Sequence, residues 1–288
     1  MKLAIGTAQF GLPYGIANQR GQVAREEIMA ILNYAWTEGV RSLDTAIAYG
    51  DSEQRLGEIG VEKWQLISKL PALPESCSEV AAWVRESVLG SLERLKLSKL
   101  HGLLLHRSHQ LLGNQGHELY RSLVALRDEG IVDKIGISIY NPDELDALYP
   151  YFKLDLVQAP FNIMDRRMVT SGWLSRLHEA GAEIHARSVF LQGLLLMDAA
   201  ERPVTFDRWQ TLWDRWHYWL NQQCLTPLQA CVGFVQSQPH IDQVVVGVDS
   251  LVQLKEILCV EKIKSVAVPK SLSTEDVQLL NPSNWVSK

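Results

Sequence analysis

Four ionisable side chains of different kinds stand at or just beyond the ends of short apolar runs. Asp44, Lys69 and His106 each close one run, and Tyr49 follows Asp44 by five residues. An acid, a lysine, a tyrosine and a histidine brought together suggest proton transfer at a carbonyl group. A tyrosine has an ordinary pKa of about 10, which is too high for efficient acid catalysis near neutral pH. A nearby Lys69 cation would lower that pKa, Asp44 would keep the lysine charged, and His106 would donate to or orient the substrate oxygen.

The elements that must position these residues alternate along the chain. Short apolar runs predict eight strands, at Leu3–Gly6, Val40–Asp44, Trp64–Lys69, Gly102–His106, Lys134–Ser138, Asp155–Ala159, Glu183–Arg187 and Gln243–Gly247. Amphipathic stretches predict helices between and after them, at Glu26–Glu38, Glu53–Ile59, Glu79–Leu95, Glu118–Glu129, Asp143–Tyr149, Gly172–Ala180, Leu228–Gln236 and Leu251–Val260. This order predicts an α/β fold with a parallel sheet.

A single-domain (β/α)8 TIM barrel over residues 1–288 accounts best for the eight repeated units. No Pro/Ser/Gly-rich linker or composition shift divides the chain. The alternative is an open, doubly wound sheet, but no GxGxxG pattern follows any predicted strand. In a barrel the carboxyl ends of all the strands meet at one mouth, so Asp44, Lys69 and His106 would converge although they are distant in sequence.

Composition limits the class of protein and its partners. The chain of 288 residues is 47% hydrophobic and 21% charged, which excludes a disordered or collagen-like protein. A net charge of −5 argues against a nucleic-acid partner. The four cysteines form no CxxC pair, so neither a zinc ribbon nor a disulfide framework is indicated. No run of 18 apolar residues or signal-peptide core is present, so we expect a cytoplasmic protein without a membrane partner.

A series of motifs resembles the aldo-keto reductase family over nearly the whole chain, from Gly6 to Glu256. The most specific stretch is LDTAIAYGDSE at 43–53, continuing to Leu56-Gly57. The others follow in the family's order: SKL at 68–70, LLH at 104–106, IGIS at 135–138, VQ at 157–158, RS at 187–188, QGL at 192–194 and VG at 246–247. The opening stretch from Gly6 to Gly15 looks like bacterial members of unassigned substrate. The resemblance implies a barrel that reduces carbonyl groups with a nicotinamide cofactor and has no Rossmann domain.

The resemblance also implies roles for individual residues. Asp44, Tyr49, Lys69 and His106 match the family's catalytic tetrad, with Tyr49 as the acid that protonates the carbonyl oxygen. Ser138 and Gln158 match positions that hold the nicotinamide carboxamide. The remaining cofactor-binding matches are Gly6, Thr7, Arg187, Ser188, Phe190, Gly193, Gly247, Asp249, Ser250, Gln253 and Glu256.

Several positions depart from the family's pattern. Ile139 replaces a frequent asparagine, and Arg187 stands where many members stack a tyrosine on the nicotinamide, although a planar guanidinium can stack as well. None of Gly247, Asp249 and Gln253 is basic, and these positions would carry the cations for the 2′-phosphate of NADPH. We therefore expect weak discrimination between NADPH and NADH. We also expect the amino-terminal hairpin that closes the bottom of the barrel in many members to be missing.

Competing interpretations remain for these residues. An Asp–Lys pair alone is often structural inside a barrel, and the accompanying Tyr49 and His106 favour catalysis. A second hypothesis is a barrel that binds nicotinamide cofactor as a sensor or regulatory subunit with little turnover. A third, a metal-dependent hydrolase, would need more His and Asp ligands at strand ends, so no metal site is predicted and His109 is expected to be structural or solvent-facing.

Two segments fall outside the regular repeat. Residues 193–225 hold four tryptophans and follow the seventh strand, so we expect this insertion on the catalytic face. The spacing of Trp209, Trp213 and Trp216 is helical, which fits either a packed face or one ring lining the substrate pocket. Residues 266–288 form a carboxyl-terminal tail.

The substrate is expected to be a small carbonyl compound, of polar or sugar-like type, and the sequence is silent on oligomeric state.

Overall fold

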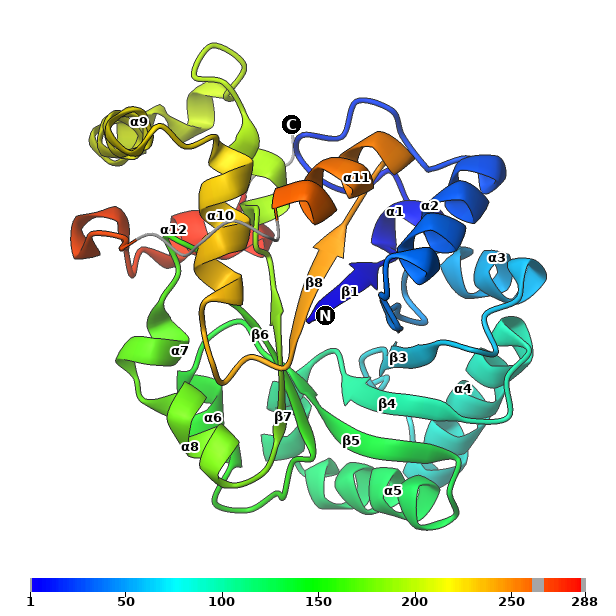
Figure 1. Cartoon of the computed structure of the whole chain (residues 1–288). Helices are drawn as coiled ribbons and strands as arrows, with labels where there is room; N and C mark the ends of the chain where they lie inside the picture. The colour runs from blue at the N-terminus through cyan, green and yellow to red at the C-terminus, as the bar shows by residue number, and fades with distance from the viewer. Residues whose placement is uncertain (1, 261–266, 286–288) are drawn as a thin grey trace.

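A computed structural model describes residues 2–260 and 267–285 and shows a closed parallel barrel (Figure 1). The eight strands follow one another in chain order, and the last pairs with the first. They are β1 (Leu3–Gly6), β2 (Ser42–Asp44), β3 (Gln65–Leu70), β4 (Leu100–Leu105), β5 (Val132–Ser138), β6 (Leu156–Pro160), β7 (Glu183–Arg187) and β8 (Gln243–Gly247). The predicted (β/α)8 barrel is confirmed.

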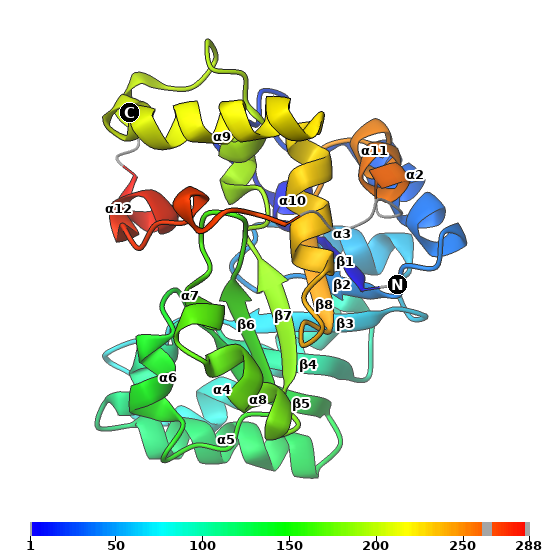
Figure 2. The ribbon, with the colours of Figure 1, turned by 60° about the vertical axis from the view of Figure 1, so that its left-hand side comes forward.

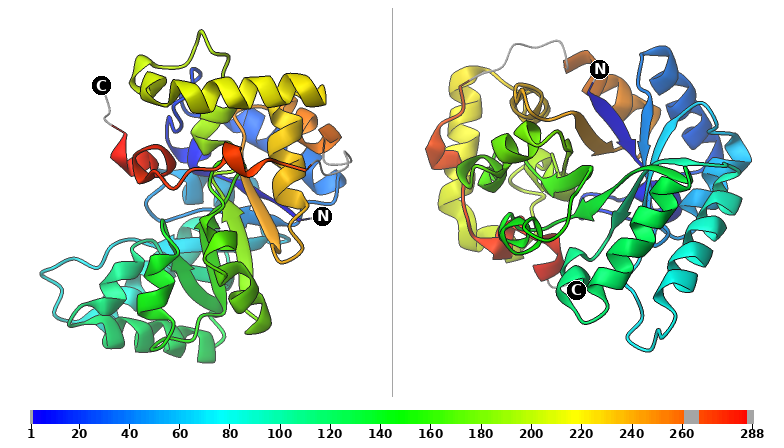
Figure 3. Two further views of the ribbon diagram at one scale, coloured as in Figure 1. Left: turned by 90° about the vertical axis from the view of Figure 1, so that its left-hand side faces the viewer. Right: turned by 90° about the horizontal axis from the view of Figure 1, so that it is seen from below.

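Helices surround the strands on the outside of the barrel, as the view from below shows (Figure 3). All eight expected helices are present: α2 (Arg25–Thr37), α3 (Ser52–Ile59), α4 (Val80–Leu95), α5 (Gly116–Asp128), α6 (Asp143–Leu148), α8 (Trp173–Glu179), α10 (Pro227–Gln236) and α11 (Leu251–Val260). The strands are almost wholly buried because helices cover the outer face of the sheet and side chains fill its interior. Ile67, Leu104 and Leu156 form a separate cluster from the main core.

Strand boundaries differ from expectation where pairing partners begin or end. The second strand was expected from Val40, but β2 begins at Ser42 because it pairs with β1 only from Ala4 onward. The fourth strand begins at Leu100, two residues earlier than expected, and ends at Leu105. His106 thus follows β4, although its backbone N–H still donates to the Leu70 carbonyl at 3.1 Å.

Short helices that the periodicity did not predict occupy the connections. They are α1 (Ala8–Gly11) and α7 (Arg167–Thr170), together with the 3-10 helices η1 (Ser108–Leu112), η2 (Leu191–Leu196) and η3 (Val204–Trp209). The tail adds η4 (Lys270–Leu272), α12 (Val277–Leu280) and η5 (Pro282–Asn284). Four-residue helices cannot show an amphipathic repeat, so hydrophobic spacing gives no signal for them. No helix in the described ranges is long and apolar enough to cross a membrane.

The tryptophan-rich segment forms a helix beyond the carboxyl ends of β6 and β7. This helix, α9 (Gln210–Gln223), lies across the top of the barrel in Figure 2, with α12 beneath it. Trp213 and Trp216 are fully buried, and the Trp213 indole donates to the Phe206 carbonyl at 2.9 Å. The tail packs on the same segment, since the Trp209 indole donates to Asp276 at 2.9 Å. The predicted tail at residues 266–288 lies partly outside the described residues, at Val266 and at 286–288.

Candidate active site

One cavity of about 600 Å³ opens at the carboxyl ends of the strands. Gly6 ends β1, Asp44 ends β2, Ser138 ends β5 and Gly247 ends β8, and all of them line it. Lys69, the penultimate residue of β3, also lines it, as do Tyr49 and His106 from the following loops. The closed barrel therefore brings the four ionisable residues to one site.

Lys69 and Asp44 form a buried ion pair at the base of this cavity. The Lys69 ammonium lies 2.5 Å from one Asp44 oxygen and also donates to the Thr45 carbonyl at 2.9 Å. The lysine is only 1% exposed. Burial favours the neutral amine, but Asp44 and Tyr49 outweigh it and raise the pKa of Lys69 above its ordinary value. The second Asp44 oxygen accepts a 2.6 Å hydrogen bond from the Gln158 amide, so both carboxylate oxygens are held.

Tyr49 lies close both to this ion pair and to His106. The Lys69 ammonium is 5.1 Å from the centroid of the Tyr49 ring, and the His106 ring meets it edge-on at 6.0 Å between centroids. Two glycines let the Tyr49 loop pack closely on α1. A Cβ at Gly11 would lie 1.8 Å from the Tyr49 carbonyl oxygen, and Gly50 has a φ of +54°. Neither position accommodates a side chain, so these glycines set where Tyr49 stands.

His106 is neutral over the physiological pH range. Burial, followed by the cations Lys69, Arg187 and Arg107, lowers its pKa to about 4, and Asp44 opposes them only weakly. A neutral imidazole has one donor and one acceptor nitrogen. His106 is therefore able to donate a hydrogen bond to an oxygen atom in the cavity without carrying a charge.

The residues expected to bind cofactor line the same cavity, with one exception. Those present are Gly6, Thr7, Ser138, Gln158, Arg187, Ser188, Phe190, Gly193, Gly247, Asp249, Gln253 and Glu256. Ser250 is buried but is not among the lining residues, because its hydroxyl accepts a 3.3 Å hydrogen bond from the Gln253 backbone at the start of α11. This contact helps to hold the start of α11, and the predicted cofactor contact of Ser250 stays a prediction.

The far end of the cavity has features that fit an extended polar ligand. Gly193 has a φ of +92°, and a Cβ there would lie 2.4 Å from the Ala17 side chain, so only glycine lets the loop after β1 close against η2. Asp249 has a buried oxygen, Oδ1, without a partner among the described residues. Burial raises the pKa of Asp249, although Gln253 and Arg20 oppose this. A buried unpaired acceptor suits a ligand that brings hydroxyl donors.

Several cavity residues were missed by sequence reasoning. Tyr14 and Gln192 join the two loops, since the Gln192 amide donates to the Tyr14 hydroxyl at 3.1 Å. Asn18 and Gln19 line the cavity from the same loop as Tyr14. Tyr140 lies two residues beyond Ser138, at the carboxyl end of β5, and this position in a barrel is the signal that could have identified it.

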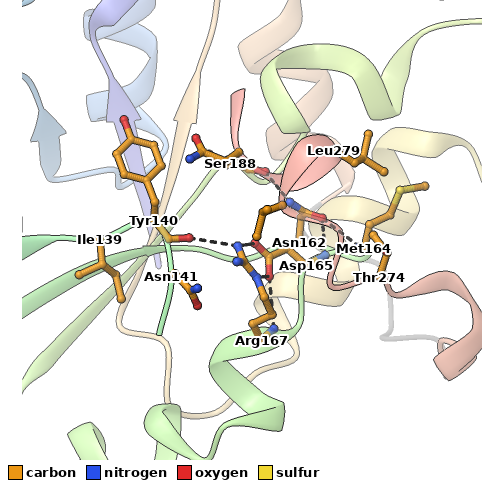
Figure 4. Close-up of polar contacts among 12 residues, drawn as sticks. Ile139, Tyr140, Asn141, Asn162, Met164, Asp165, Arg167, Ser188, Thr274 and Leu279 are labelled. Carbon is orange, nitrogen blue, oxygen red and sulfur yellow. Dashed lines mark hydrogen bonds and ion pairs between the residues drawn. The ribbon is translucent and has the colours of Figure 1, made fainter. Parts of the chain in front are cut away.

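A buried polar cluster supports the loop after β5 and the loop after β7 (Figure 4). Asp165 binds the Arg167 guanidinium through both oxygens, at 2.8 and 2.7 Å. Arg167 then donates to the Tyr140 carbonyl at 3.0 Å, and the Asn162 amide donates to the Ser188 carbonyl at 3.0 Å. Since Asn162 and Asp165 are almost fully buried, this cluster fixes the backbone on either side of the cavity wall.

The tryptophan-rich insertion contributes to the cavity through other residues. Gly193, Leu196, Met197 and Glu201 line it, whereas none of the four tryptophans does. Trp216 and Trp219 stack on each other with centroids 5.8 Å apart. Of the two interpretations of these rings, the structure therefore supports packing.

Within the described residues, no group of three or more His, Cys, Asp or Glu side chains is arranged to hold a metal ion.

Comparison with known proteins gives the family. A model of the aldo/keto reductase family matches residues 2–271. A D-threo-aldose 1-dehydrogenase from Pseudomonas sp. is 28% identical over 258 residues, covering 74% of this chain and 76% of that protein. An aldo-keto reductase from Mycobacterium sp. (strain JLS) is 26% identical over 209 residues, covering 69% of this chain and 73% of the relative.

Solved structures share the fold. An aldo-keto reductase from Bacillus halodurans, in its holo form, superposes with a TM-score of 0.74 at 19% identity and covers 96% of this chain and 94% of its own. A glycerol dehydrogenase from Gluconobacter oxydans gives a TM-score of 0.70 at 19% identity, with 92% and 88% covered. Because the family model matches nearly the whole chain, the protein belongs to the aldo/keto reductase family, whose members reduce carbonyl compounds to alcohols with NAD(P)H.

Proposed function

We propose that this protein reduces an aldehyde or ketone to an alcohol, with Tyr49 as the general acid. The cofactor, when bound, supplies the hydride that adds to the carbonyl carbon. Tyr49 delivers its hydroxyl proton to the carbonyl oxygen, on which negative charge develops. The observation that carries this proposal is that the Tyr49 ring lies close to both the Lys69 ammonium and His106 in one cavity.

The other residues of the proposed site serve this proton transfer. Lys69 has a raised pKa and so stays charged, which stabilises the phenolate that Tyr49 leaves behind. Asp44 holds Lys69, and Gln158 holds Asp44. Neutral His106 donates a hydrogen bond to the substrate oxygen and orients it.

The cavity residues also support binding of a dinucleotide that extends from Ser138 and Gln158 to the segment after β8. Gly193 permits the close approach of two loops along this path, and the unpaired Asp249 oxygen is an acceptor for a ribose hydroxyl. Since Asp249 also repels a phosphate, we propose that NADH is bound about as well as NADPH.

We further propose a small polyhydroxylated carbonyl compound as substrate. Two proteins similar to this chain are named for polyhydroxylated compounds, one for an aldose, which is a sugar aldehyde, and one for the polyol glycerol. Polar side chains, among them Gln9, Tyr14, Asn18 and Gln192, line the cavity and supply donors and acceptors for hydroxyl groups.

Replacing Tyr49 by phenylalanine tests the central assignment. Tyr49→Phe keeps the ring but removes the proton donor, so kcat for an aldehyde such as glyceraldehyde should fall by about 10²–10⁴-fold while NADH still binds. The matched control is Tyr140→Phe, because this cavity tyrosine is not proposed to give a proton. A Tyr49→Phe variant with more than half of the original kcat contradicts the assignment. Cofactor binding without turnover in the unaltered protein would instead support the sensor hypothesis.

A further inference from the structure

Arg187 is a fixed cation in the cavity wall without an acidic partner among the described residues. Its three guanidinium nitrogens donate to neutral oxygens: Nη2 to the Ile139 carbonyl at 2.8 Å, Nη1 to the Ser188 hydroxyl at 3.1 Å and Nε to the Ser138 hydroxyl at 3.4 Å. The guanidinium carbon lies 4.6 Å from the centroid of the Tyr140 ring. These contacts hold the group in place but do not neutralise its charge.

The other charges at this end of the cavity cancel. Lys69 is paired with Asp44, and His106 is neutral because its pKa is about 4. The remaining acids of the cavity, Glu201, Asp249 and Glu256, come from the segments after β7 and β8, and none of them forms an ion pair with Arg187 in the described part of the chain. The guanidinium is close enough to the reacting end to contribute to the lowered pKa of His106. One uncompensated positive charge therefore faces the place where a carbonyl would react.

We propose that Arg187 makes this cavity bind the reduced nicotinamide cofactor more tightly than the oxidised one. This inference rests on the proposed function. Loss of a hydride turns the neutral dihydronicotinamide ring into a cationic pyridinium ring. A ring that gives hydride to a carbonyl held at Tyr49 must lie in the same cavity, so its positive charge is repelled by the fixed guanidinium.

Three hydrogen bonds restrain the guanidinium from turning away from this repulsion. The loops that carry its partners are held in turn, since Arg167 binds the Tyr140 carbonyl and Asn162 binds the Ser188 carbonyl (Figure 4). The cavity thus fills with the reduced cofactor and releases the oxidised one. The overall equilibrium of the reaction is unchanged, because tighter binding of the reduced form makes hydride donation on the protein correspondingly less favourable.

Arg187 could instead contact one of two anionic groups, and each contact would change the measured binding constants in a different way. The cofactor's pyrophosphate is the same in both redox forms, so a contact with it would strengthen both equally. A carboxylate on the substrate would leave cofactor binding unaffected and would change KM for anionic aldehydes alone. Only repulsion of the charged ring changes the ratio of the two dissociation constants.

The test is fluorescence titration of the purified protein with NADH and NAD⁺, repeated with NADPH and NADP⁺, at one low ionic strength. The unaltered protein should bind the reduced form about tenfold or more tightly, as expected for two like charges several ångströms apart at a partly buried site. Arg187→Gln should bring the ratio of the two constants close to one. Arg187→Lys keeps a charge and should preserve most of the ratio.

Arg107→Gln is the matched control, because Arg107 is an exposed cation beside His106 that does not line the cavity. This variant should leave the ratio unchanged. Circular dichroism establishes that each variant is folded. A ratio near one in the unaltered protein, equal weakening of both forms by Arg187→Gln, or no change at all would overturn the inference. Failure of the unaltered protein to bind any nicotinamide cofactor would instead overturn the proposed function.

Discussion

The barrel buries one acid–base cluster at each of its two ends, and the two differ in surroundings more than in composition. At the carboxyl end, Asp44 binds Lys69 and Gln158. At the amino end, Glu183 binds His101, His185 and Lys134, which come from β4, β7 and β5. Both clusters hold buried ionisable groups in contact, yet only the first lines the cavity.

The amino-end cluster is built to keep Glu183 charged. Burial alone would raise the pKa of Glu183, but hydrogen bonds from His101, His185 and Lys134 outweigh it and hold that pKa well below its usual range. His185 is fully buried, and its Nδ1 has no partner among the described residues. The comparison teaches that buried charge alone does not identify a functional site, since such networks also perturb pKa values for structural reasons.

The largest expected effect is a loss of activity when the cluster at the carboxyl end is changed. Lys69→Met removes the cation beside Tyr49, so kcat for carbonyl reduction should fall by about 10²–10⁴-fold. The same change leaves Asp44 as a buried unpaired charge, which should also destabilise the fold by about 3 kcal/mol. The double variant Lys69→Met/Asp44→Asn separates the two effects, because it should recover stability in urea unfolding but not activity. Recovery of kcat in the double variant would show that Lys69 acts only through the fold.

The amino-end cluster should show the opposite pattern. Glu183→Gln removes the charge that three side chains share, which should lower the free energy of unfolding by about 3 kcal/mol while kcat stays within about twofold. The matched control is Glu129→Gln, which breaks an exposed ion pair with Arg85 and should barely change stability. A large loss of kcat in folded Glu183→Gln protein would mean that this end also serves the reaction.

The pH dependence of stability gives the same cluster an independent test. Because the pKa of Glu183 is depressed in the folded state, its contribution is present above the unfolded value of about 4.3 and is lost as pH falls through the folded value. The unaltered protein should therefore lose stability on acidification more steeply than Glu183→Gln. Parallel stability curves for the two proteins from pH 7 to pH 3 would contradict this account.

The sequence was most informative where a residue's role depends on its place on a strand. All eight strands and the convergence of Asp44, Lys69 and His106 follow from hydrophobic periodicity and the geometry of a barrel. Contacts between loops could not be predicted in this way. The Tyr14–Gln192 hydrogen bond joins residues from the first and seventh connections, and no local pattern specifies that these connections meet.

Two further contacts have the same physical origin. Gln158 is predicted to hold the nicotinamide carboxamide, and its amide also donates to Asp44, a contact across the barrel that strand spacing does not specify. Ser250 is predicted near the adenosine end of the cofactor, and its hydroxyl also accepts from the Gln253 backbone. In both cases a polar side chain takes a partner whose position depends on the closed structure.

The next prediction concerns the pH profile of the reaction. A histidine with an ordinary pKa of about 6.5 would be almost fully protonated at pH 5, whereas His106, with a pKa of about 4, would be roughly nine-tenths neutral there. We therefore expect kcat/KM to show no loss from His106 between pH 7 and pH 5. In the unfolded chain this histidine has its ordinary pKa, so it is protonated at a higher pH than in the folded protein. The free energy of unfolding should therefore fall as pH drops from about 6.5 toward 4. An acid limb near pH 6.5 that disappears in His106→Gln would contradict the assignment.

The smallest expected effect is on cofactor binding, and it concerns Asp249. Among the described residues, this acid lacks the partners that Asp44 and Glu183 have. Its Oδ1 is buried and has no partner within residues 2–260 and 267–285, and its backbone N–H donates to the Gln253 side chain at 2.7 Å. A 2′-phosphate near this carboxylate would be repelled, whereas a ribose hydroxyl could donate to it. Arg20 is close enough to help lower the pKa of Asp249 and is the nearby cation that could offset the repulsion.

Asp249→Asn should therefore strengthen NADPH binding roughly tenfold and change NADH binding much less, because it removes a like charge but keeps a polar side chain. Arg20→Gln should weaken NADPH binding alone, so its expected effect is opposite to that of Asp249→Asn. Dissociation constants for both cofactors, measured at one ionic strength, decide the matter because the phosphate interaction is screened by salt. A preference of the unaltered protein for NADPH above about a hundredfold would show that other cations supply the phosphate site and that Asp249 does not repel it.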